Sequence, residues 1–587
     1  MEGRPIWIWA AIAALVGFVL LRVAGGAWQG AGPIPGSRPG GGAVAISIAS
    51  SSSKQEWLHQ AVEAFNEATK RDRALQVDGR PVQVEILQEV IEGKKVDYRS
   101  GTMVTDTLSG KIKPTVLSPG DESWIVQFRR EWQVAHGTPI AREDAPILVR
   151  SPMVLAMWQS RAKALGCWPA AGSECTWQRI RDVAAHPGGW ELVGRPEWRR
   201  LKIGYSYFGE GNSGTLGVVA MCMRGAGKTQ GLTLADVEAG NGCGELIGAV
   251  EKAKVHSGNS SSWLLEKMAT SGPEYLDAAF TWEVEVIGLN QKFAKDLREP
   301  IVAVYPQDGT MLVGHPFAIL DGAPWATPEQ VAAAKVFGRF LLGREQQERV
   351  LATGLRPVDA AVKLGPPIAP ANGANPDTRV VVLEVPEAAV IERVGEVWHV
   401  VKKHAAVALV LDKSGSMSSG GKMRAAIKGA QEFVGRMDGE DRLLWMPFDT
   451  KVYAGVEGRK ADVGERLLDD IAGLTAGGGT ALYDAVLLAH QRLGEVRQTH
   501  EDAYRYGIVV LSDGKDENSR QRLTALEAAL RPSEGDPTGI QIHTIAIGAD
   551  ADEQVLKRMA QAAHGRYWKG GSDNDLVGIY GAIAKHY

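Results

Sequence analysis

Cysteine is scarce in this chain, with four residues among 587. No cysteine lies in a CxxC motif or beside histidine at zinc-ligand spacing, which argues against a cysteine-based zinc site. Cys167 and Cys175 lie close together in the sequence, and Cys222 and Cys243 flank a glycine-rich segment. An even number with local partners predicts the disulfides Cys167–Cys175 and Cys222–Cys243, and with them an oxidising compartment. The alternative is four free thiols in a reducing compartment.

The chain also lacks an excess of positive charge. Its 65 Lys and Arg against 69 Asp and Glu give a net charge of −4, which offers no support for a nucleic-acid partner. Apolar residues make up 44% and charged residues 23%, as in ordinary folded proteins. A chain of this length is too long for one core, so several structural units are expected.

Two common catalytic signatures are missing. No GxSxG nucleophile elbow occurs. The segment Arg224–Thr229 contains Gly-Lys-Thr, but Cys222 stands where a phosphate-binding loop requires its first glycine. The fragment also follows a helical pattern rather than a strand. The sequence therefore predicts a binding protein rather than an enzyme.

Charge is absent from one long stretch near the N-terminus, Pro5 to Leu21. Its length is near the lower limit for a membrane-spanning helix and exceeds the usual apolar region of a signal peptide. No lipobox cysteine follows. We expect residues 1–24 to form an uncleaved transmembrane anchor, with a cleaved signal as the alternative. In both cases the rest of the chain lies outside the cytoplasm, as part of a membrane-bound, secreted or periplasmic protein.

Proline and glycine mark the boundaries between the units. Residues 25–42 read as a flexible tether, and residues 365–379 hold a second cluster of prolines and glycines. These breaks predict a middle domain over 43–364 and a C-terminal domain over 380–587. The C-terminal domain would begin with a lead-in helix over Pro386–Lys403.

The C-terminal domain alternates apolar strand-like runs with helical patterns. The predicted strands are Val407–Leu411, Leu443–Phe448, Gly507–Leu511 and Ile542–Ile547. Strands that alternate with helices predict a doubly wound α/β fold, in which helices cover both faces of a parallel sheet.

Polar side chains gather after the predicted strands of this domain. Asp412, Ser414 and Ser416 follow the first strand, and Asp513 follows the strand Gly507–Leu511. Thr480 ends a Gly-Gly-Gly-Thr segment at the start of a helical pattern. The carboxyl edge of an open α/β sheet is where such folds bind ligands, and hard oxygen donors suit Mg²⁺.

This pattern, DxSxS followed by a Thr and an Asp, resembles the von Willebrand factor A domain and its metal-ion-dependent adhesion site. The resemblance implies a divalent cation, Mg²⁺ or alternatively Mn²⁺ or Ca²⁺. It also implies a coordination position left open for a carboxylate of a protein partner. The implied metal residues are Asp412, Ser414, Ser416, Thr480 and Asp513.

The middle domain offers serine-rich loops at the starts of helices. Hydroxyls, free backbone N–H groups and the helix dipole favour an anion there, although serine is also the ordinary helix cap. Trp124 or Trp282 could instead stack on an organic ligand. The candidate ligand residues are Ser51, Ser52, Ser118, Ser151 and Ser213.

The order of several short segments in this domain resembles the type II extracellular solute-binding proteins of ABC importers, the molybdate- and sulfate-binding kind. The segments are a strand–Ser–helix start, Ser151–Ala156, the turn Pro306–Thr310 and Gly354–Pro357. The resemblance implies two α/β lobes that are joined by crossing strands, with a small solute or oxyanion between them.

Together these patterns predict a membrane-anchored extracytoplasmic receptor of adhesion type. Its middle domain would capture or sense a solute, and its C-terminal domain would bind a partner through the cation. The alternative is the substrate-binding component of an ABC-type transport system. A metal-dependent enzyme or a chelatase-like accessory ranks behind both, because the sequence shows no catalytic acid–base pair.

Overall fold

The computed structural model describes residues 42–91, 94–169, 174–209, 211–258, 260–378, 381–500, 504–531, 539–548, 550–571 and 573–584. Within these ranges no helix is both long and apolar enough to cross a membrane. The predicted anchor at 1–24 and most of the tether at 25–42 lie outside the described residues. The remainder is a mixed α/β structure that is rich in parallel strands.

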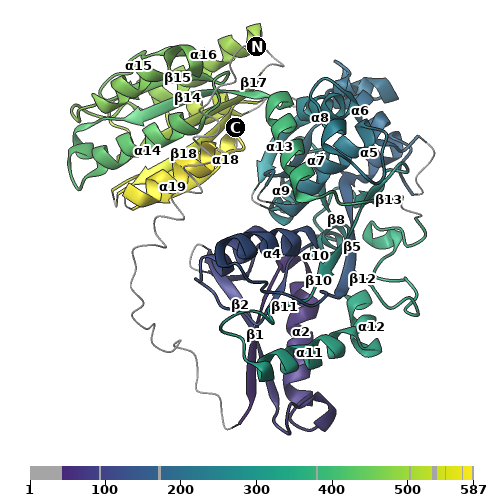
Figure 1. The fold of residues 1–587 in the computed structure, drawn as a ribbon. Helices are drawn as coiled ribbons and strands as arrows, with labels where there is room; N and C mark the ends of the chain where they lie inside the picture. Colours follow the sequence, from purple (N-terminus) through teal and green to yellow (C-terminus); the bar gives the residue numbers. More distant parts are fainter. Residues whose placement is uncertain are drawn as a thin grey trace, which may run out of the picture. The chain divides into compact units, whose positions relative to one another are not determined.

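The first lobe of the middle domain is built on a five-stranded sheet in the order β11-β4-β1-β2-β3. Its helices include segments far apart in the sequence, and Figure 1 shows α11 and α12 beside the N-terminal elements β1 and α2. Phe65 of α2 and Phe337 of α11 meet in this core with ring centroids 4.9 Å apart. The elements are β1 (Val44–Ser50), α2 (Gln55–Ala68), β2 (Val82–Ile91), β3 (Lys94–Asp97), α3 (Ser100–Leu108), β4 (Val116–Ser118), α4 (Ser123–His136), β11 (Ala318–Ile319), α11 (Pro328–Leu342) and α12 (Arg344–Ala352).

The second lobe surrounds a sheet in the order β13-β10-β5-β8-β6-β7, to which β9 and β12 add by pairing with β5. Its strands are β5 (Ile147–Trp158), β6 (Ile203–Ser206), β7 (Lys254–Gly258), β8 (Ala278–Trp282), β9 (Ile301–Val304), β10 (Thr310–Pro316), β12 (Arg356–Pro357) and β13 (Val382–Leu383). Its helices are α5 (Gln159–Ala164), α6 (Trp177–Ala185), α7 (Asn212–Gly225), α8 (Gly242–Ala253), α9 (Ser261–Ser271), α10 (Glu283–Lys292) and α13 (Ala388–Val401).

Strand β5 belongs to both lobes. Leu148 and Val149, near its start, pack in the core of the first lobe, whereas Leu155 and Met157 pack in the core of the second. Its antiparallel partner β10 leads directly into β11 of the first-lobe sheet. These strands are the crossing strands that the sequence resemblance implied. Both predicted disulfides, Cys167–Cys175 and Cys222–Cys243, are present and lie in the second lobe.

The C-terminal domain is a six-stranded sheet in the order β16-β15-β14-β17-β18-β19. Alternate residues of β14 enter separate apolar clusters on the two faces, with Val407 and Leu409 in one and Ala408 and Val410 in the other. The elements are β14 (His404–Asp412), α14 (Lys422–Arg436), β15 (Arg442–Phe448), β16 (Glu457–Arg459), α15 (Lys460–Ala472), α16 (Leu482–Thr499), β17 (Tyr504–Ser512), α17 (Leu523–Leu530), β18 (Gln541–Ile547), α18 (Glu553–Ala562), β19 (Tyr567–Gly570) and α19 (Asp573–Ala584).

Helix α13 packs elsewhere than the sequence suggested. Its residues Val390, Val394 and Val397 enter the core of the second lobe, where α13 contacts α7 and α8. Strand β13, which precedes it, pairs with β10 of the same lobe. The apolar face of this helix therefore completes the middle domain before the chain enters β14.

Candidate binding and metal sites

A cavity of about 80 Å³ lies in the middle domain and is lined by residues of both lobes. The first lobe contributes Ser51, Ser52 and Ser53, which follow β1, together with Tyr98, Arg99, Ser100 and Gly120. The second lobe contributes Ser206, Gly211, Asn212, Ser213, Ser260, Ser261, Ser262, Trp282 and Glu285. The volume is below the roughly 300 Å³ at which pockets for organic ligands usually begin, so it favours a small ligand.

Three helices begin at this cavity. Ser100 is the first residue of α3, Asn212 the first of α7, and Ser261 the first of α9. Ser52 and Ser53 belong to the short 3₁₀ turn that leads into α2. The first turn of a helix leaves backbone N–H groups without intrahelical acceptors and carries partial positive charge. Their convergence on one cavity therefore favours a negatively charged ligand.

The buried side chain of Lys54 holds the loop Ser51–Ser53 in place through hydrogen bonds. The Lys54 ammonium donates to Ser51 Oγ at 2.9 Å and to the Ser118 carbonyl at 2.7 Å, and its side chain is almost fully buried. Burial lowers the pKa of Lys54 from 10.5 to about 7, against an opposing effect of Asp97. His315 Nδ1 lies 3.5 Å from the ammonium, and burial likewise lowers the pKa of this histidine.

Asn212 brings a side-chain amide donor to the cavity. Its nitrogen is buried, and an interaction with it lowers the pKa of the buried Asp121 carboxyl, against the larger rise that burial causes. A Cβ atom on Gly120 would lie 3.2 Å from this nitrogen and 3.2 Å from Ser100 Oγ, so glycine keeps the space between them open. A side-chain amide has two N–H donors, so Asn212 can donate to a ligand oxygen as well as to a protein group.

The charges at the cavity do not all favour an anion. Arg99 is paired with Glu89, its Nε lying 3.1 Å from Glu89 Oε1. Glu285 brings a carboxylate to the lining, where it accepts a hydrogen bond from Ser262 Oγ at 2.7 Å and another from Thr281 Oγ1. The donors that remain for a ligand are mainly hydroxyl, amide and backbone N–H groups.

The five serines that the sequence singled out separate into two groups. Ser51, Ser52 and Ser213 line the cavity. Ser118 and Ser151 are not among its lining residues; Ser118 Oγ donates to the Pro316 carbonyl at 2.6 Å, and Ser151 is buried on β5. Of the two candidate tryptophans, Trp282 lines the cavity and Trp124 does not. Ser100 and Ser260–Ser262 also line the cavity and were not predicted from the sequence, because serine is also an ordinary helix cap.

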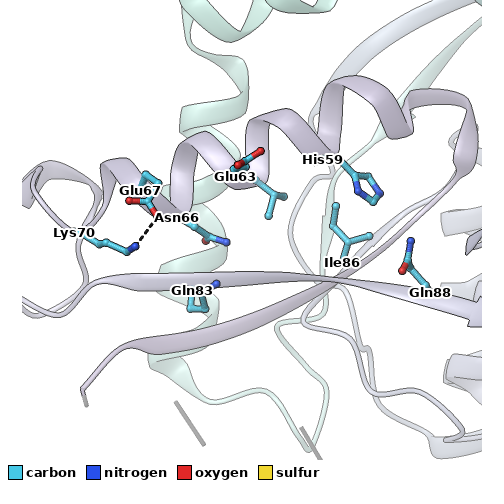
Figure 2. Close-up of a pocket in the computed structure, with 9 residues that line it drawn as sticks. His59, Glu63, Asn66, Glu67, Lys70, Gln83, Ile86 and Gln88 are labelled. Carbon is cyan, nitrogen blue, oxygen red and sulfur yellow. Dashed lines mark hydrogen bonds and ion pairs between the residues drawn. The ribbon is translucent and has the colours of Figure 1, made fainter. Parts of the chain in front are cut away.

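A larger hollow of about 470 Å³ lies between α2 and β2 (Figure 2). Most of its polar side chains are already engaged. Asn66 exchanges two hydrogen bonds with the Val84 backbone, Lys70 pairs with Glu67 at 2.5 Å, and His59 and Gln88 both contact Asp97. Size alone favours this hollow, but the smaller cavity has the converging helix starts.

In the C-terminal domain, the candidate metal residues meet at the carboxyl edge of the sheet. Asp412 ends the central strand β14, and Asp513 directly follows the neighbouring parallel strand β17. Ser416 Oγ donates to Asp513 Oδ1 at 2.7 Å and lies 3.0 Å from Ser414 Oγ. Asp412 Oδ1 accepts the Ser414 N–H at 2.8 Å, and its Oδ2 accepts Ser512 Oγ at 2.6 Å.

Thr480 approaches the same point from a third loop. A Cβ atom on Gly514 would lie 3.7 Å from Thr480 Oγ1 and 3.7 Å from Ser416 Oγ. Because glycine lacks this atom, no side chain of residue 514 separates the two hydroxyls. The loop is fixed by Asn518, whose Oδ1 accepts the Thr480 N–H at 2.9 Å. The structure thus gathers Asp412, Ser414, Ser416, Thr480 and Asp513, all of which are buried except the more exposed Ser416.

This group fits a hard divalent cation by its chemistry. It offers three neutral hydroxyls and two carboxylates, and every donor atom is oxygen. Burial raises the pKa of Asp412, hydrogen bonds from Ser414 and Ser512 oppose the rise, and the nearby Asp513 charge adds to it. Two buried carboxylates so close together require a positive counter-charge. In this structure Lys422 supplies one, with its Nζ 2.6 Å from Asp513 Oδ2.

A second group of metal-ligand type lies near the start of β14. Ligand atoms of His404, Asp438 and Asp441 all fall within 4.8 Å of one another. Asp441 is already engaged, because its oxygens accept the backbone N–H groups of Ala405 at 2.7 Å and Asp438 at 2.6 Å. Lys402 lies 3.0 Å from Asp438. These hydrogen bonds make the group a closed turn whose acidic oxygens already have partners.

Two family models match the chain. The model for bacterial extracellular solute-binding proteins matches residues 46–356, more than half of its length, and the model for the von Willebrand factor type A domain matches residues 406–580. The two matches correspond to the middle and C-terminal domains described above. Domains of both kinds are typically binding modules of extracellular or periplasmic proteins.

Among curated proteins, the chain is 23% identical over 451 residues to the uncharacterized Mycobacterium tuberculosis protein Rv1836c. That match covers 73% of this chain but 61% of the relative, so the chain spans less than two thirds of the relative's length. A second relative, the uncharacterized protein sll0103 of Synechocystis, is 28% identical over 158 residues, which are 27% of this chain and 35% of that protein.

Solved structures with similar parts include a Bordetella parapertussis protein described as an extracellular solute-binding protein, at 12% identity and a TM-score of 0.39. It covers 60% of this chain and 98% of its own. A von Willebrand factor type A structure from Catenulispora acidiphila has 17% identity and a TM-score of 0.28, and covers 31% of this chain and 42% of its own.

The low pKa of Lys54 gives a pH-dependent stability that can be measured. Between pH 7 and 10.5 the unfolded chain binds more protons at this position than the folded chain does. The free energy of unfolding should therefore rise with pH in that window by up to about 1.4 kcal/mol per pH unit. Lys54→Met should lack this contribution. Urea unfolding of both proteins from pH 6 to 10 tests it, and parallel profiles would contradict the assignment.

Proposed function

Because the chain belongs to the bacterial extracellular solute-binding proteins and continues into a von Willebrand factor type A domain, we propose that it is an extracytoplasmic receptor with two binding sites. The cavity between the lobes captures a small oxyanion. The carboxyl edge of the C-terminal sheet holds a divalent cation that engages a carboxylate of a protein partner. The stretch from Pro5 to Leu21 anchors the receptor in the membrane.

The single observation that carries the solute proposal is the convergence of helix starts and hydroxyls on one cavity between the lobes. A small tetrahedral oxyanion presents acceptors in several directions and needs donors from both lobes. Ser51 and Ser52 approach from one lobe, and Asn212 and Ser213 from the other. The resemblance to type II solute-binding proteins implies binding of this kind, and the small volume of the cavity supports it.

The metal proposal is supported by the gathered oxygen donors of a metal-ion-dependent adhesion site. Asp412, Ser414, Ser416, Thr480 and Asp513 would hold Mg²⁺, or Mn²⁺ or Ca²⁺ in its place. A bound ion of this kind polarises water or a partner carboxylate at its open position. The role of the protein is to fix the hydroxyls and to place the two carboxylates beside them.

Contacts of the C-terminal domain with the second lobe lie at the opposite end of its strands. Arg505, near the start of β17, pairs with the buried Glu251 at 3.0 Å, and Gln541, at the start of β18, donates to the Val255 carbonyl at 3.0 Å. Arg566, just before β19, lies 4.2 Å from the ring centroid of Trp263 on α9. The amino edge of the sheet thus serves attachment, which is compatible with partner binding at the carboxyl edge.

A transport component is the second candidate, because the solute-binding domain accounts for more than half of the chain. In that case the C-terminal domain would dock the protein to other components. The two proposals share both binding sites and differ in what receives the solute: an interacting permease favours transport.

Oxyanion binding is tested by titrating sulfate, molybdate and phosphate into the full chain. We expect at least one to bind, and Asn212→Leu to weaken it about 10- to 100-fold, because a buried hydrogen bond to a charged ligand is worth roughly 1.5–3 kcal/mol. The matched control is Gln83→Leu in the larger hollow, which should bind as the wild type does. Wild-type affinity in Asn212→Leu, or weaker binding in Gln83→Leu alone, would contradict oxyanion binding in the cavity between the lobes.

Metal binding is tested by thermal unfolding with and without Mg²⁺. An ion at 100 times its Kd stabilises the folded state by about 2.7 kcal/mol, so the transition of the C-terminal domain should rise by several degrees. Asp412→Asn should abolish the rise, whereas Asp438→Asn in the group near His404 should retain it. The reverse result would place the ion near His404, and an unchanged transition in wild type would remove the metal from the proposal.

A further inference from the structure

Lys422 is a positive charge built into the proposed metal site. It is the first residue of α14, and its ammonium donates to Asp513 Oδ2 at 2.6 Å. Only 13% of its side chain is exposed, and Asp513 is fully buried. The other oxygen of Asp513 accepts Ser416 Oγ. Both oxygens of this carboxylate are therefore engaged, one by a hydroxyl and one by a full positive charge.

The position of this lysine runs against the preference of the helix. The start of a helix carries partial positive charge and favours acidic residues, so a lysine there gains nothing from the helix dipole. The carboxylate of Asp513 offsets that cost.

The fold also leaves room for the Lys422 side chain. Gly548, which follows β18, has φ +83°, and a Cβ at this residue would lie 2.7 Å from Cε and 3.1 Å from Nζ of Lys422. Glycine adopts this positive φ without strain, and its missing Cβ leaves space for the Lys422 side chain. Lys422 thus reaches Asp513 along a path that a larger residue would obstruct.

We propose that Lys422 is a tethered counter-cation that competes with the divalent ion for Asp513 and thereby sets the affinity of the metal site. This inference rests on the proposed metal site at the same residues. An ion held by Ser416 and Asp513 lies close to the ammonium, and the two positive charges repel each other at short range in a buried setting. Entry of the ion therefore requires Lys422 to withdraw from Asp513.

Two consequences follow from this competition. Without metal, Lys422 neutralises one of the two buried carboxylates and keeps the edge of the sheet folded. With metal, the withdrawal of Lys422 opposes binding, so the ion binds more weakly than its oxygen donors alone would allow. Lys422 is therefore a residue that determines affinity rather than a ligand of the ion.

The test is calorimetric titration of Mg²⁺ and of Mn²⁺ into the full chain, together with thermal unfolding in the absence of metal. Lys422→Met should bind both ions at least tenfold more tightly than wild type, and its metal-free transition should fall because Asp513 loses its counter-charge. Lys422→Gln, which keeps a hydrogen-bond donor, serves if Lys422→Met fails to fold. The matched control is Lys428→Met, an exposed lysine on the same helix, which should leave affinity unchanged.

The outcomes separate this inference from the metal site itself. Ion binding by Lys422→Met or Lys422→Gln when wild type binds none would support the competition directly. Equal affinity in wild type and both variants would overturn it and leave the metal site standing. Absence of ion binding in wild type and in every Lys422 variant would overturn both.

Discussion

Two buried carboxylates at the edge of one sheet impose the main constraint on the C-terminal domain. Asp412 ends one strand and Asp513 follows the adjacent parallel strand; both are fully buried, and burying two carboxylates is costly without nearby positive charge. The structure meets this demand with hydroxyl donors on two of the four oxygens, the Ser414 backbone N–H on the third, and Lys422 on the fourth. The proposed metal site, its open face and its dependence on Lys422 all follow from the same pair of charges.

The solute-binding domain uses the same end of its strands in a different way. Ser51 follows β1, Ser260 closely follows β7, and Trp282 ends β8. Open α/β sheets place ligands beyond the carboxyl ends of their strands, where helices begin. In this domain the edge presents hydroxyls and N–H groups and suits an anion, whereas in the C-terminal domain it presents carboxylates and suits a cation.

Much of this organisation could be predicted from the sequence because its signals are local. The segment Asp412–Ser416 is contiguous, and strand–helix alternation places the ends of β14 and β17 on one edge. The pairing of the four cysteines also followed from local spacing. The short edge strands β16 and β19 were not predicted, because three or four residues without a long apolar run carry little pattern.

The remaining features depend on contacts between distant segments. Lys422 reads in the sequence as an ordinary helix residue, and only the approach of α14 to the end of β17 brings it to Asp513. Helix α13 was assigned by proximity in the sequence to the domain that follows it, yet its valines complete the second lobe. Ser118 and Ser151 looked equivalent to Ser51 in sequence, but only the folded chain shows which hydroxyls line the cavity.

The most direct measurement of the central claim is anomalous diffraction from crystals of the full chain soaked in Mn²⁺. The account predicts a single strong peak among Ser414, Ser416, Thr480 and Asp513, with the Lys422 ammonium moved away from Asp513. A peak between His404, Asp438 and Asp441, or an ion at Asp513 with Lys422 still in contact with that carboxylate, would contradict it.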